Sequence, residues 1–200
     1  MKKITPTLKV LAVAAVFLVL AGCNKISRTS ESSTMIVIQS ITGTTIEGDT
    51  VAYLQSDVLD ADGFVRVNNA TANIIARLVN PDPIEGPSQF NDVVLTNYRV
   101  TYETPTGPGT VGVDVPAGFD GNFSTVLCQV GKATSVPFVV VLEAAKLAAP
   151  LVGLLNTNTV IETRAKIELF GHDLNDRSVT ATGYLTIFFA DYQTAPAVKK

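Results

Sequence analysis

IETRAKIEL, residues 161–169, alternates apolar or small side chains with charged ones at every second position. Successive side chains of a β-strand point to opposite faces, so this stretch predicts a strand with one face in a core and the other in solvent. Residues 172–177 are polar except for Leu174 and predict a turn, and a second alternating run over 179–189 predicts a returning strand. The two runs together predict a β-hairpin.

Similar patterns continue towards the amino terminus. Short runs rich in Val, Ile, Thr, Tyr and Phe are separated by segments rich in Gly, Pro, Asn and Asp, which is typical of strands joined by turns. The runs predicted as strands are 35–39, 51–58, 71–79, 93–103, 123–130 and 136–143. Prolines in 80–87 and 104–109 predict loops, because proline cannot donate to a central β-ladder.

Residues 142–155 are the one ambiguous segment. Leu147, Leu151 and Leu154 fit one face of a helix, but Pro150 would interrupt it. We therefore expect a crossover connection with at most one or two helical turns.

Seven to nine short strands with turn-rich connections predict an all-β fold, a β-sandwich of two antiparallel sheets over residues 34–192. On residues 90–102, on 112–116 and on the final hairpin, the chain resembles the immunoglobulin-like or fibronectin-type sandwiches of bacterial surfaces. The disulfide and core Trp of antibody domains are missing. The resemblance implies an architecture and not a function.

The amino terminus has the features of an export signal. Lys2, Lys3 and Lys9 precede and flank an apolar run over residues 10–21. That run is shorter than the roughly 20 apolar residues that a membrane-spanning helix needs. A positive segment followed by a short apolar one predicts a signal peptide over residues 1–22, which is removed from the mature protein.

The residues that follow the apolar run add a more specific feature. Leu20, Ala21, Gly22 and Cys23 resemble the lipobox of bacterial lipoproteins. The resemblance implies that Cys23 is the site of lipid attachment and that its acyl chains anchor the protein to a membrane. In the lipoproteins that the chain resembles, an Asp after the lipidated cysteine often marks retention in the inner membrane, so the resemblance implies that Asn24 favours the outer membrane. Residues 23–33 are polar and predict a flexible tether, and 193–200 are expected to form a disordered tail.

The charge of the chain argues against a nucleic-acid partner. Without residues 1–22 the chain keeps its 18 acidic residues and loses three of its 15 basic ones, which leaves a net charge of −6. No cluster of Lys and Arg provides a surface for nucleic acid, so we expect no nucleic-acid partner.

No pattern of residues indicates catalysis. If Cys23 carries lipid, Cys128 is the single remaining thiol, and its position in an apolar alternating run predicts an inert core residue. The only histidine, His172, falls in a predicted turn. There is no G-x-S-x-G, no set of zinc ligands and no Gly-rich phosphate loop. We therefore predict that the protein is not an enzyme and has no cofactor.

Two local features leave binding alternatives open. Asp57, Asp60 and Asp62 place three carboxylates in one segment, which suits calcium, although Asp and Gly also make ordinary turns. Tyr98 and Tyr102 share one strand face, where they would either stack on a sugar or pack in the core. Our first hypothesis is a non-enzymatic, lipid-anchored envelope protein with a structural or protein-binding role. The alternative is a calcium-dependent or carbohydrate-binding surface module.

Overall fold

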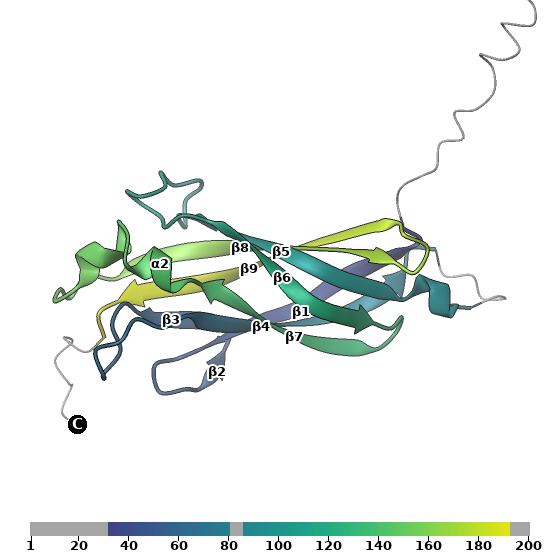
Figure 1. Ribbon diagram of the computed structural model, residues 1–200, viewed down its shortest axis with the longest axis horizontal. Helices are drawn as coiled ribbons and strands as arrows, with labels where there is room; N and C mark the ends of the chain where they lie inside the picture. Colours follow the sequence, from purple (N-terminus) through teal and green to yellow (C-terminus); the bar gives the residue numbers. More distant parts are fainter. Residues whose placement is uncertain (1–31, 81–85, 193–200) are drawn as a thin grey trace, which may run out of the picture. The chain divides into compact units, whose positions relative to one another are not determined.

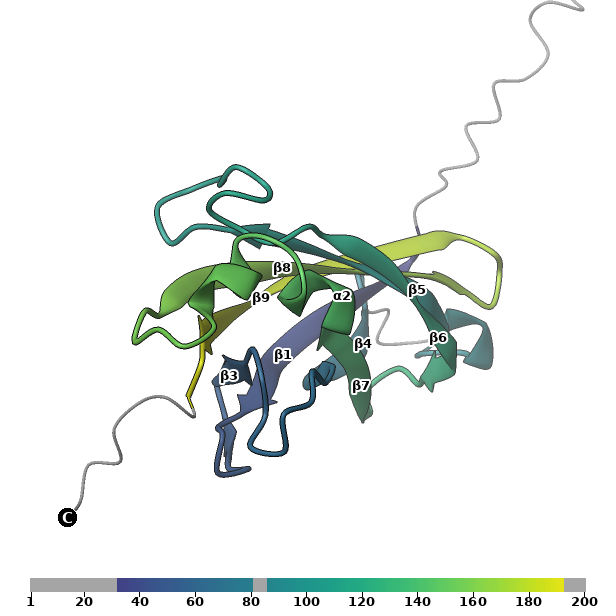
Figure 2. The same cartoon turned by 60° about the vertical axis from the view of Figure 1, so that its left-hand side comes forward.

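Two β-sheets packed face to face contain most of the residues that the computed structural model describes, which are 32–80 and 86–192. Figure 2 shows the two layers, with β1, β4 and β7 in one and β5, β8 and β9 in the other. The predicted all-β sandwich is thus confirmed. The predicted signal peptide, Cys23 and the predicted tail lie outside the described residues.

The strand order places every element of the sandwich. The four-stranded sheet runs β2 (Thr50–Val51), β1 (Thr34–Thr44), β4 (Asn68–Leu78) and β7 (Ala133–Val141). The five-stranded sheet runs β3 (Tyr53–Asp57), β9 (Ser178–Ala190), β8 (Ile161–Asp173), β5 (Val93–Glu103) and β6 (Phe119–Cys128). The edge strands β7 and β6 follow each other in the chain and lie in different sheets.

The predicted carboxyl-terminal hairpin is the pair β8 and β9, which run antiparallel from Ile161↔Phe189 to His172↔Ser178. Ala165, Ile167 and Leu169 are buried, as their alternation predicts. Charged side chains of β8, including Glu162 and Arg164, lie on the opposite face in solvent.

The single strand predicted over residues 51–58 is wrong. It divides at Ala52 into β2 and β3, and these two strands belong to different sheets. Because β3 crosses to the second sheet there, it pairs in parallel with β9, from Tyr53↔Thr186 to Asp57↔Ala190. The expectation that both sheets are wholly antiparallel is corrected by this one pair.

The remaining predictions hold with shifted boundaries. β5 covers the predicted 93–103, whereas β4, β6 and β7 each begin three or four residues earlier than predicted. The ambiguous segment after β7 contains two short helical pieces, α2 (Glu143–Lys146) and η2 (Leu151–Leu154), as expected. A further turn, η1 (Gln89–Asn91), precedes β5.

The immunoglobulin-like label is not confirmed. Immunoglobulin constant domains combine a four-stranded and a three-stranded sheet. Here the second sheet has five strands and includes the parallel pair of β3 with β9. The structure therefore supports a β-sandwich without assigning it to that group.

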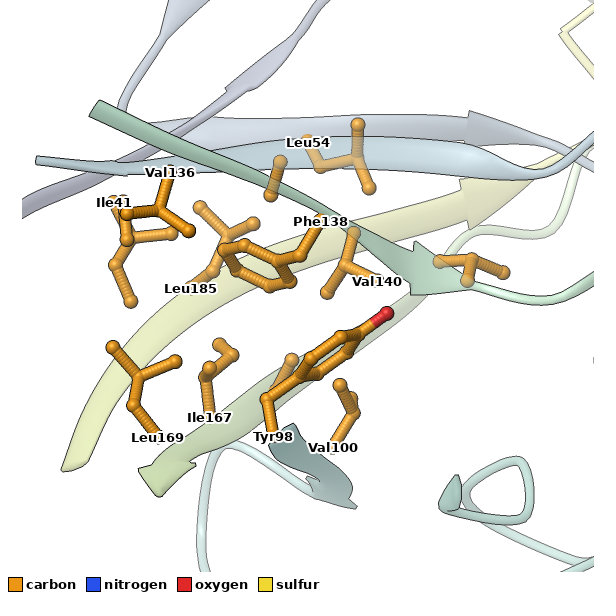
Figure 3. Packing of buried hydrophobic residues seen from close by; sticks show 14 of the residues in the cluster. Ile41, Leu54, Tyr98, Val100, Val136, Phe138, Val140, Ile167, Leu169 and Leu185 are labelled. Atoms are coloured by element: carbon orange, nitrogen blue, oxygen red, sulfur yellow. The ribbon is translucent and has the colours of Figure 1, made fainter. Parts of the chain in front are cut away.

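The core lies between the sheets and is built from alternate residues of both. Figure 3 shows Tyr98 and Ile167 of one sheet facing Phe138 and Val140 of the other. The hydroxyl of Tyr102 on β5 donates a hydrogen bond of 2.6 Å to the carbonyl oxygen of Val140 on β7, inside the core. This bond satisfies the buried phenol and links the two sheets.

The two sides of the sandwich differ. On one side β1 and β3 approach so closely that a Cβ at Gly43 would lie 2.6 Å from the carbonyl oxygen of Tyr53, so only glycine fits. On the other side β6 and β7 end their sheets.

Strand direction also gives the sandwich two distinct ends (Figure 1). The end where β1 begins, beside the β8–β9 turn, is called the tether end below. The opposite end, which carries α2 and η2, is called the far end.

Candidate functional site

A cleft of about 420 Å³ lies between β6 and β7. Its floor and walls are lined by Asn69, Tyr98, Asn122, Phe123, Ser124, Val126, Pro137, Phe138 and Val139. Aromatic and aliphatic groups form most of this lining, and two Asn side chains and one Ser side chain add polar groups. An apolar cleft with a few polar groups is the usual composition of a binding site.

The floor of the cleft is an aromatic cluster centred on Tyr98. Its ring centroid lies 4.9 Å from that of Phe123, 5.3 Å from that of Phe138 and 6.3 Å from that of Phe119. Edge-to-face and tilted pairs at these separations are favourable. Only 5% of Tyr98 is exposed, and burial raises the pKa of its hydroxyl, so the phenol stays protonated at neutral pH.

The edge strands that border the cleft have features that hinder pairing with a further strand. β7 carries Pro137, which has no backbone N–H, and β6 has an irregular register near Thr125, where φ is 46°. Prolines and bulges are common protections of open sheet edges. A ligand in the cleft would therefore contact side chains and would not add a strand to an open edge of either sheet.

Tyr98 and Tyr102 do not form a sugar-binding platform. They are 5% and 6% exposed, and both pack between the sheets. The alternative that assigned them to the core is confirmed. The carbohydrate hypothesis loses the two residues on which it rested.

The structure does not bring Asp57, Asp60 and Asp62 together. Asp60 accepts hydrogen bonds from the backbone N–H groups of Asp62 and Phe64 and forms an ion pair with Arg66. The same guanidinium lies 3.6 Å from Asp62, whereas Asp57 accepts a bond from the backbone N–H of Tyr192. Within residues 32–80 and 86–192, no three His, Cys, Asp or Glu side chains are placed to hold a metal ion.

Cys128 is buried, as predicted, with no exposed surface, and burial raises the pKa of its thiol to about 11. His172 lies at the end of β8, and its Nδ1 is 3.0 Å from the carbonyl oxygen of Asp173. Val93 pairs with Cys128, and its neighbour Val94 pairs with His172. The thiol and the imidazole therefore point to opposite faces of the sheet and cannot act as a catalytic pair.

Lys146 was not identified from the sequence. It is 3% exposed, and its Nζ donates a hydrogen bond of 2.6 Å to the carbonyl oxygen of Asp57. Burial lowers its pKa to about 8, against the opposing effect of nearby Asp57, Asp60 and Glu143. Because the amine is covered, its evident role is to hold α2 against the end of β3.

The outer face of the five-stranded sheet carries paired charges. Arg99 bonds Asp120 at 2.7 Å, Arg164 bonds Glu103 at 2.6 Å, and Lys166 bonds Glu168 at 3.0 Å. Each of these basic groups is neutralised by a neighbour on its own sheet. Exposed pairs of this kind contribute little to stability and present no net charge to a ligand.

No protein-family model matches this chain, and no curated protein is significantly similar to it. None of the helices in the described residues is both long and apolar enough to cross a membrane. Any assignment of function therefore depends on the chemistry of the chain itself.

Proposed function

We propose that this chain is a lipid-anchored, non-enzymatic protein of the bacterial outer membrane, whose sandwich domain binds another component of the cell envelope. The observation that carries the proposal is the order of features before the domain. A positive segment and a short apolar run lead directly to Leu20, Ala21, Gly22 and Cys23. According to this proposal, the covalent lipid anchor attaches the protein to the membrane, and the domain binds a second partner.

Physical arguments favour a lipid anchor over weaker forms of attachment. A mature chain with a net charge of −6 is repelled by anionic lipid. A single acyl chain binds a bilayer only marginally, whereas two or more bind it stably, at about 0.8 kcal/mol for each buried CH₂. A diacylglyceryl group on Cys23 would therefore hold the domain at the membrane without help from its surface.

We expect Cys23→Ala to move the protein from the membrane fraction to the soluble fraction while leaving the fold unchanged, because residue 23 precedes the described domain. Fractionation with immunoblotting measures the first effect, and circular dichroism measures the second. Ser33→Ala is the matched control and should stay with the membrane. A Cys23→Ala protein that still sediments with membranes, or a native protein whose intact mass includes no acyl groups, would contradict the anchor.

The cleft between β6 and β7 is the proposed binding site for the partner. Ser124 is an exposed residue that lines it, so Ser124→Arg should block the cleft without disturbing the core. We expect this change to remove most of the crosslinked partner detected by mass spectrometry in intact cells. Thr182→Arg, an exposed position on the outer face of β9, is the control and should leave crosslinking unchanged. Equal crosslinking by both variants would place the binding site elsewhere.

A further inference from the structure

The tether end carries a group of exposed apolar side chains around the point where the described chain begins. Phe90, Leu127, Leu174 and Val79 are 54%, 48%, 44% and 46% exposed. Phe90 belongs to η1, Leu127 to the end of strand β6 and Leu174 to the β8–β9 turn, and Val79 directly follows β4. Large apolar side chains that project from neighbouring turns form a surface suited to an apolar partner.

Hydrogen bonds fix these turns to one another and to the start of the domain. The side-chain amide of Asn175 donates to the carbonyl oxygen of Phe90, and the backbone N–H of Leu174 donates to that of Asp92. The Ser32 hydroxyl donates a bond of 2.6 Å to Asp173, and the backbone N–H of Val79 donates to Ser33 at 2.8 Å. Ser32 and Ser33, the last residues of the predicted tether, are thus attached to this end.

The length of the tether limits the distance from this end to the membrane. Ser32 is the ninth residue after Cys23. A fully extended chain spans at most about 3.3–3.6 Å for each residue, so the anchor keeps Ser32 within roughly 30 Å of the lipid. A short tether of this kind holds the tether end and the lipid surface at an effective concentration on the order of millimolar. Weak apolar contacts are then sufficient to bring them together.

Charge distinguishes the two ends of the domain. The described loops of the far end, residues 45–49, 57–67, 104–118, 142–160 and 190–192, contain eight acidic residues and two basic ones. Residues 79–92, 129–132 and 173–177, which join strands at the tether end, contain five acidic residues and two basic ones in the sequence, so this end has a smaller excess of acid than the far end. The far end also exposes apolar residues such as Val113 and Leu147, but its excess of acid opposes contact with anionic lipid.

We propose that the tether end rests on the membrane, with Phe90 and Leu174 inserted past the lipid headgroups to the boundary of the acyl chains. This inference depends on the proposed lipid anchor and adds an orientation to it. The β8–β9 turn and η1 face the lipid, and the far end with its acidic loops faces away from it. The cleft between β6 and β7 then stands at the side of the domain, where a partner can reach it.

The absence of Trp from the chain allows a direct test. Phe90→Trp introduces a single fluorophore at the tether end, and Val113→Trp introduces one at the far end, where Val113 is 67% exposed. The full lipidated proteins are reconstituted in vesicles of brominated phosphatidylcholine with phosphatidylglycerol. Bromine quenches only fluorophores that contact the acyl chains. We expect Phe90→Trp to lose most of its emission and Val113→Trp to keep it. Leu174→Trp should behave like Phe90→Trp.

Three other results would overturn the inference. Equal emission from Phe90→Trp and Val113→Trp would show that the tether end does not meet the lipid. Unquenched, blue-shifted emission from Phe90→Trp that depends on protein density would show that a second copy of the chain covers this end. A protein that fails to float with the vesicles would overturn the lipid anchor itself, which separates that failure from failure of the orientation.

Discussion

Tyr98→Ala is expected to lower the free energy of unfolding by about 3–4 kcal/mol, the range found when a large buried aromatic side chain is truncated. On the side where the two sheets are otherwise open, the ring packs against Phe123 of its own sheet and joins that sheet to the other through Phe138. It also covers Gly121, where a Cβ would lie 2.3 Å from the Tyr98 ring. Its removal would leave a cavity that the fixed strands cannot close. Urea unfolding followed by circular dichroism measures the change.

Two controls separate packing from the other functions of a tyrosine. Tyr98→Phe keeps the ring and removes the hydroxyl, so it should cost no more than about 1 kcal/mol. Tyr184→Ala removes a ring that is 50% exposed on the outer face, and its effect should also stay within about 1 kcal/mol. A small effect of Tyr98→Ala would mean that the ring is not part of the core. The hypothesis of an aromatic ligand platform would then return.

The parts of the fold that depend on local alternation could be predicted from sequence. The β8–β9 hairpin requires only that polar and apolar residues alternate around a turn, and β5 is bounded by loops rich in turn formers. Each prediction depends on residues close together in the chain, so the chain itself contains the necessary information.

Sheet membership could not be predicted in this way. The run 51–58 has the composition of one strand, and nothing in it marks Ala52 as the point where the chain passes between sheets. At that crossing β1 approaches β3 closely at Gly43, and a contact of this kind between the two sheets is not visible in the composition of either run. The cleft has the same origin, because it exists only where β6 and β7 both become edge strands.

The arrangement of the three carboxylates in the candidate calcium segment could not be predicted for a related reason. Three carboxylates within six residues are visible in the sequence, but the pairing of Asp60 with Arg66 depends on the conformation of the loop. Since the guanidinium occupies the oxygen atoms that a cation would need, the loop is held by an ion pair among its own residues. Buried Tyr98 and Tyr102 show the same limit, because alternation assigns residues to a face without saying which face is buried.

The second large effect is expected at Asp173, which has no exposed surface and accepts three hydrogen bonds at the tether end. Its Oδ1 accepts the backbone N–H groups of Asn175 at 2.9 Å and Arg177 at 3.0 Å, and its Oδ2 accepts the Ser32 hydroxyl at 2.6 Å. Hydrogen bonds to a charged acceptor are each worth about 1.5–3 kcal/mol, and water can replace part of them at this turn. Asp173→Ala should therefore lower the free energy of unfolding by about 2–3 kcal/mol.

The pH dependence of stability gives an independent measurement of the same group. Burial alone would raise the pKa of Asp173, but the hydrogen bonds from Ser32, Arg177 and Asn175 outweigh it and hold the pKa below its usual range. A carboxyl with a lowered folded pKa stabilises the fold above its unfolded pKa, at about 4. That contribution is lost as the pH falls through the folded pKa. Asp173→Asn should remove this component of the acid dependence.

Asp176→Asn is the matched control for Asp173→Ala, since its side chain is 97% exposed in the same turn. It should change the free energy of unfolding by no more than about 0.5 kcal/mol. If Asp173→Asn kept the acid dependence of the native protein, the carboxylate would not be the charged acceptor at this end. Because the Ser32 hydroxyl is one of the three donors to Asp173, Asp173→Ala would also release the start of the domain. The buried carboxylate of Asp173 therefore contributes both to the stability of the fold and to the position of Ser32 at the start of the domain.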